Sequence, residues 1–123
     1  MKFFPQVLAA ILLSHHHYYC VKAVAVGGAS DNGNANSVAI GLTGTTITTN
    51  ANSVAIGNDA ATNGGNSVAV GLSTRGTGSN SVAIGNGAVG LADQTVAIGT
   101  VANAGFANSI AIGNGSTANG ASG

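Results

Sequence analysis

The chain has 123 residues, of which 20 are glycine and only 5% are charged. This length allows one domain or one short repeat array and excludes several independent modules. The formal net charge is zero, and polarity comes from asparagine, serine, threonine and glycine placed between short apolar runs. Such a chain stays soluble only if its backbone polar groups are paired.

The first segment, residues 1–23, has the order of a secretory signal peptide. Lys2 precedes an apolar run from Phe3 to Leu13, and the polar stretch SHHHYYCVKA then ends in a small residue. We expect cleavage after Ala23, with Ala25 as the alternative site, and a leader that is helical or disordered. The apolar run is shorter than the about 20 residues that a membrane-spanning helix needs.

The predicted mature chain, residues 24–123, lacks the groups that catalysis uses. It contains no His, Cys or Lys, and its three acidic residues, Asp31, Asp59 and Asp93, are scattered. With Arg75 as its one cation it has a net charge of −2, and it has no basic patch for nucleic acid or for an anionic membrane. We therefore expect no enzyme, no cofactor, no metal site and no small-molecule substrate.

A repeat of about 14 residues fills this region. Within the phrase NSVAIG, Val38 and Ile40 lie two positions apart, which is the period of a β-strand. These two residues therefore share one face, while Ser37, Ala39 and Gly41 share the other. Variants of the phrase end at glycines that are 14 residues apart, with one step of 16, and these are Gly27, Gly41, Gly57, Gly71, Gly85, Gly99 and Gly113.

The rest of each unit is mostly small and polar. Small residues three and five positions after the glycine predict a second, weaker strand between Gly- and Asn-rich turns. Each unit then forms one coil, and about seven coils stack in parallel at about 4.8 Å into an all-β solenoid. We expect the β-branched residues of the phrase to fill the coils as the structural core, and these are Val38, Ile40, Val54, Ile56, Val68, Val70, Val82, Ile84, Val96, Ile98, Ile110 and Ile112.

The first residue of each phrase forms a second column. Stacked side-chain amides can hydrogen-bond along the axis. We expect such an Asn ladder at Asn36, Asn52, Asn66, Asn80, Gln94 and Asn108.

A single array of these coils is predicted to have a thin core. Ordering the 14 residues of a coil costs on the order of 20 kcal/mol, whereas burying two aliphatic side chains contributes about 3–6 kcal/mol. Ladder hydrogen bonds and burial against another surface must supply the difference. We therefore expect oligomerisation, with the Ser/Ala/Gly face allowing neighbouring backbones to approach closely.

The 14-residue period and the phrase NSVAIG, followed by G-x-x-A-x-A/G, resemble the YadA-like head (haemagglutinin-type) repeat of trimeric autotransporter adhesins, over about residues 22–123. The resemblance implies a left-handed parallel β-roll that forms a homotrimer and is secreted or presented at the cell surface, associated with the outer membrane where an anchor exists. It also implies attachment to host cells or extracellular matrix, or self-aggregation. The alternative is a passive spacer or a self-associating surface fibre without a dedicated ligand.

The end of the array departs from the family pattern. Neither stalk heptads nor anchor strands follow the repeats, and an eighth phrase would begin at position 122. A solenoid normally ends in an atypical capping repeat. We expect a fragment, a truncated gene or a subunit that docks onto another chain.

Other motifs favour simpler interpretations. The stretch GNGAVG at residues 85–90 matches a dinucleotide-binding pattern, but no amphipathic helix follows it, so its glycines are assigned to turns. His15 to His17 and Cys20 lie in the predicted leader. The aspartates occupy different columns, which disfavours a repeated calcium site, and a single threonine cluster at residues 45–49 disfavours an ice-binding face. Phe106 is expected in a turn, as a contact to a neighbouring coil or protomer, or as an exposed anchor for a partner.

Overall fold

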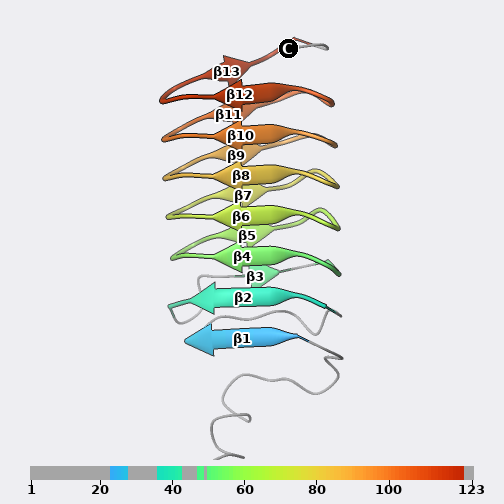
Figure 1. The fold of residues 1–123 in the computed structure, drawn as a ribbon, viewed down its shortest axis with the longest axis vertical. Coiled ribbons are helices and arrows are strands. Elements are labelled where there is room, and N and C mark those ends of the chain that lie inside the picture. The colour runs from blue at the N-terminus through green and yellow to red at the C-terminus, as the bar shows by residue number, and fades with distance from the viewer. Residues whose placement is uncertain (1–22, 28–35, 43–46, 49, 121–123) are drawn as a thin grey trace, which may run out of the picture.

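The computed structural model describes residues 23–27, 36–42, 47–48 and 50–120, which contain strands β1 to β13 and no helix. The predicted leader lies outside these residues up to position 22, and so do Asp31, most of the threonine cluster and residues 121–123. The described residues form a parallel β-solenoid of about six turns, which confirms the predicted fold class. In Figure 1 the coils lie one above the other, from β1 at the bottom to β13 at the top.

The NSVAIG phrases form the longer strands, as predicted. Alternating Val, Ala and Ile suit an extended backbone that is paired on both edges. The strands pair in parallel and in register, so that Val54 lies beside Val68, and Ala55 beside Ala69. Together they make a seven-stranded sheet in the order β1 (Val24–Gly27), β2 (Val38–Gly41), β4 (Val54–Ile56), β6 (Val68–Val70), β8 (Val82–Ile84), β10 (Val96–Ile98) and β12 (Ile110–Ile112).

The predicted second strand is also present, as two residues in each coil from β2 onward. These short strands form a parallel six-stranded sheet of β3 (Ile47–Thr48), β5 (Ala61–Thr62), β7 (Arg75–Gly76), β9 (Val89–Gly90), β11 (Asn103–Ala104) and β13 (Thr117–Ala118). From β2 to β13, long and short strands alternate along the chain, and from β4 onward a turn joins each strand to the next (Figure 1).

The single 16-residue step does not disturb the long-strand sheet. Val38 still pairs with Val54, although the two are 16 positions apart. In the short-strand sheet, Ile47 pairs with Ala61, 14 positions further on. The two extra residues therefore lie between β2 and β3. The predicted outward bulge falls mainly on residues 43–46, outside the described residues.

The interior of the coils is not filled by the β-branched residues, and the prediction that they form the core is wrong. The side chains with no exposed surface are those of alanine, serine and threonine, such as Ala55, Ser67 and Thr62. The β-branched residues of the phrase point the other way and are partly or largely exposed in the single chain. Val and Ile therefore do not fill the coil.

Lack of space inside the coil explains this inversion. A Cβ atom on Gly76, in the short strand β7, would lie 3.1 Å from the Ser81 Oγ and 3.3 Å from the Val68 carbonyl oxygen. The two sheets of a coil thus approach so closely that only small side chains fit between them. The Ser/Ala/Gly face does allow a close approach, but between the two sheets of one chain.

Hydrogen bonds satisfy most of the interior hydroxyl groups. The Ser67 Oγ donates to the Gly78 carbonyl oxygen at 2.7 Å, and the Ser53 Oγ donates to that of Gly64 at 3.2 Å. Each bond links the start of a long strand to the turn beyond the short strand. These bonds hold the two layers of the flat coil together. They matter because small side chains bury little apolar area and so stabilise the interior only weakly.

Candidate assembly and adhesion surface

The most prominent surface of the described chain is the outer side of the long-strand sheet, which we call the aliphatic face. It consists of the outward Val and Ile side chains of β1, β2, β4, β6, β8, β10 and β12. Near the ends of the array these side chains are largely exposed, as for Val26 at 51% and Ile112 at 65%. Between the ends most are partly exposed, because the equivalent Val or Ile side chains above and below cover them.

In-register stacking makes this face continuous. Each long strand places two β-branched side chains outward, and its neighbours place theirs directly above and below. Seven strands at their usual spacing give two aliphatic columns about 30 Å tall. Soluble monomers rarely leave so large an apolar face in water, and such faces mark interaction sites.

The turns after β4, β6, β8 and β10 are built on the repeated glycine. Gly57, Gly71, Gly85 and Gly99 have φ values between 130° and 132°, a region that L side chains rarely adopt. A Cβ atom on Gly85 would lie 2.5 Å from the carbonyl oxygen of Gly99 in the next coil. The glycine is therefore needed both for its backbone conformation and for the spacing of the coils.

The turn before each long strand contains the predicted Asn column. The Asn36 Nδ2 donates to the Asn52 Oδ1 at 3.0 Å, and the Asn52 Nδ2 donates to the Asn66 Oδ1 at 3.1 Å. Every member also has a left-handed backbone, from φ 56° at Asn36 to 63° at Asn108. This conformation was not predicted from the sequence, although asparagine is the residue that, after glycine, adopts it most readily.

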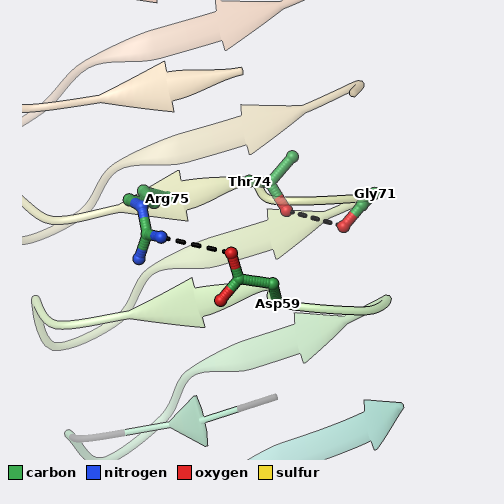
Figure 2. A network of polar contacts seen from close by, with 4 residues as sticks. All are labelled: Asp59, Gly71, Thr74 and Arg75. Atoms are coloured by element: carbon green, nitrogen blue, oxygen red, sulfur yellow. Dashed lines mark hydrogen bonds and ion pairs between the residues drawn. The ribbon is translucent and has the colours of Figure 1, made fainter. Parts of the chain in front are cut away.

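One ion pair links neighbouring coils. Figure 2 shows the Arg75 guanidinium on β7 pointing toward the carboxylate of Asp59 in the coil below, with an Nη2 to Oδ2 distance of 3.3 Å. Both side chains are about half exposed, at 47% and 49%, so the pair contributes little to stability. Beside it, the Thr74 Oγ1 donates to the Gly71 carbonyl oxygen at 3.0 Å and closes the turn (Figure 2).

Asp93 accepts a hydrogen bond from the Ser79 backbone N–H of the coil below, at 2.8 Å. Asp59 and Asp93 thus have separate structural partners and do not come together. Among the residues that the structure describes, no three His, Cys, Asp or Glu side chains gather to hold a metal ion. In the same residues, no helix has the length and apolar character needed to cross a membrane.

Exposed apolar side chains outside the aliphatic face lie mostly in the turns. Leu72 and Val101 follow long strands, and Leu91 and Phe106 follow short ones. Phe106, predicted to lie in a turn, does so and is 48% exposed. The stretch GNGAVG forms the whole turn after β8 and continues into β9. Two of its glycines, Gly85 and Gly87, therefore lie in the turn, and Gly90 lies in the strand.

A family model describes the same repeat. The model for the YadA head domain repeat, in two copies, matches residues 49–74, 77–102, 91–116 and 107–123, which together are more than half of the chain. The chain belongs to the YadA head repeat family. Among curated proteins, no sequence matches it significantly.

The YadA head repeat family is a structural adhesin family, associated with surface-exposed trimeric autotransporter adhesins rather than with enzymes. Membership supports a general adhesin-like role for this chain. The matched region begins after the two extra residues of the 16-residue step and covers the regular coils from β4 onward. These are the coils in which the small interior, the glycine turn and the aliphatic face recur without interruption.

Proposed function

We propose that this chain is the head segment of a surface-exposed or secreted adhesin, which acts as a homotrimer. The observation that carries the proposal is the aliphatic face. In the single chain it is unpartnered along the whole described array, and burial of apolar area is the main driving force of protein association. Family membership supports three as the number of copies.

Adhesion itself is assigned to the surfaces that such a trimer leaves in water. These are the outer side of the short-strand sheet and the turns, where residues differ from coil to coil: β5, β7, β9 and β11 present Ala61, Arg75, Val89 and Asn103 outward. Each such contact is shallow and carries little charge. Three copies, each with several coils, multiply weak contacts through avidity. Host cells and extracellular-matrix proteins are the proposed targets, together with other heads of the same kind.

A binding assay tests adhesion. The purified chain, residues 24–123, is added to surfaces coated with collagen, with fibronectin or with cells, and bound protein is measured. A matched control carries the same residues with the outward turn and short-strand positions scrambled, and the interior and aliphatic face unchanged. The proposal predicts that the unaltered chain binds to the coated surface and that the control does not.

Two other outcomes would contradict the proposal. If both proteins are folded and bind equally weakly, the chain is a passive spacer. Self-association without surface binding would indicate a surface fibre.

A further inference from the structure

The turn between β12 and β13 contains a motif that the adhesive role does not use. Asn114, Gly115 and Ser116 form the tripeptide Asn-x-Ser, the acceptor sequence for N-linked glycosylation. Although asparagine is frequent in this chain, no other Asn has Ser or Thr two residues later. In the NSVAIG phrases the serine directly follows the asparagine, which does not satisfy the motif.

The turn presents Asn114 to solvent on a fixed backbone. The residue is exposed, and its side chain makes no hydrogen bond to any part of the chain that the structure describes. Gly115, with φ 65°, donates its N–H to the Thr100 carbonyl oxygen at 2.8 Å. The Ser116 hydroxyl donates to the Gly113 carbonyl oxygen at 2.9 Å and is not buried. The acceptor amide is therefore free while its turn is held in place.

The chain contains a nearly identical turn without the motif. Between β8 and β9, Asn86 is also exposed, Gly87 has φ 67°, and the Gly87 N–H donates to the Leu72 carbonyl oxygen at 2.8 Å. This turn has Ala88 where the other has Ser116. The two asparagines share position, exposure and backbone, and they differ in the hydroxyl group two residues later.

We propose that Asn114 is a site of N-linked glycosylation. The donor is a sugar whose anomeric carbon is joined to a phosphate leaving group, and a glycosyltransferase of the producing cell catalyses the transfer. The Asn114 Nδ2 forms a bond to the anomeric carbon, the bond from that carbon to the phosphate oxygen breaks, and the amide loses one proton. A sugar at this corner would add hydrophilic bulk to a surface with very few charges. The proposal does not depend on adhesion.

Mass spectrometry of the protein from the cells that produce it tests this site. Peptides that contain Asn114 are expected to carry the mass of one or more sugars, while peptides that contain Asn86 from the same sample carry none. Ser116→Ala should abolish the modification, and Ser116→Thr should retain it. Both variants should fold, because the same column holds Ala60, Ala88 and Ala102 as well as Thr74.

Three results would overturn the proposal. The first is an unmodified Asn114 in the protein from its own cells. The second is a sugar on Asn86 as well, because the hydroxyl group would then not determine the site. The third is a sugar that persists on Asn114 in folded Ser116→Ala.

Discussion

The repeated glycine is the residue with the least freedom to change. Gly85 combines φ 130° with a carbonyl oxygen of the next coil 2.5 Å from where a Cβ atom would lie. Gly85→Ala should therefore lower the free energy of unfolding by at least about 1–3 kcal/mol, the usual cost of a strained backbone, because the clash adds to it. Chemical denaturation followed by circular dichroism measures the change.

Gly87 provides the matched control in the same turn. It also has positive φ, at 67°, but a Cβ atom there would only approach a Val101 methyl group, at 3.9 Å. Asp59, at the equivalent position two coils earlier, already has φ 58°. Gly87→Asp should change stability much less than Gly85→Ala. Equal losses of stability in the two variants would show that coil spacing does not depend on the repeated glycine.

The Asn column has two separable roles, a left-handed backbone and an amide ladder. Asn52 has φ 59°, accepts a side-chain hydrogen bond from Asn36 and donates one to Asn66. Asn52→Gly removes the ladder but permits the conformation, whereas Asn52→Ala removes both. The alanine variant should be less stable than the glycine variant by about 1 kcal/mol in denaturant unfolding. If the two variants are equally stable, backbone conformation is not the reason for asparagine here.

At the scale of the element, the two faces of a long strand differ in whether they accept a larger side chain. The inner face does not, whereas the outer face does. Ala83 has no exposed surface, while its neighbour Val82 points outward and is partly exposed. Ala83→Leu should destabilise the fold by about 1–3 kcal/mol or more, because overpacking a close-packed interior forces the backbone apart. Val82→Ile adds a methylene outside the coil and should change stability little. Thermal unfolding of both variants measures the difference, and a stable Ala83→Leu protein would contradict a flat, filled interior.

The sequence predicts the strands, their register and the two faces of each strand. It does so because period-two alternation and a fixed repeat length determine which residues stack on which. Alternation alone does not determine which face points into the coil. Hydrophobicity alone favours Val and Ile over Ser and Ala for the interior, and this led to the wrong prediction of the core. The signal for the correct choice was present in the opposing short strand, where Thr62, Gly76 and Gly90 leave room only for small partners. The ligand could not be predicted, because adhesive contacts depend on variable side chains that no repeat constrains.

At the scale of the whole molecule, the aliphatic face determines how the chain associates. Val68 lies on β6, in the middle of the seven-stranded sheet, and is only partly covered in the single chain. Sedimentation equilibrium of the purified chain should give the mass of a trimer. Val68→Lys should give a smaller mass with unchanged circular dichroism, because a charge buried at an interface without a partner opposes association.

The outer side of the short-strand sheet offers the control for this charge. Ala61 lies outward on β5, in the same column as Arg75, which is exposed there. Ala61→Lys therefore adds the same charge at a position where the chain already accepts a cation, and it should leave the mass unchanged. If both lysine variants dissociate the assembly, charge alone is responsible and the aliphatic face is not the interface. If the unaltered chain sediments as a folded monomer, the apolar columns have another occupant, and adhesion must act without avidity from three copies.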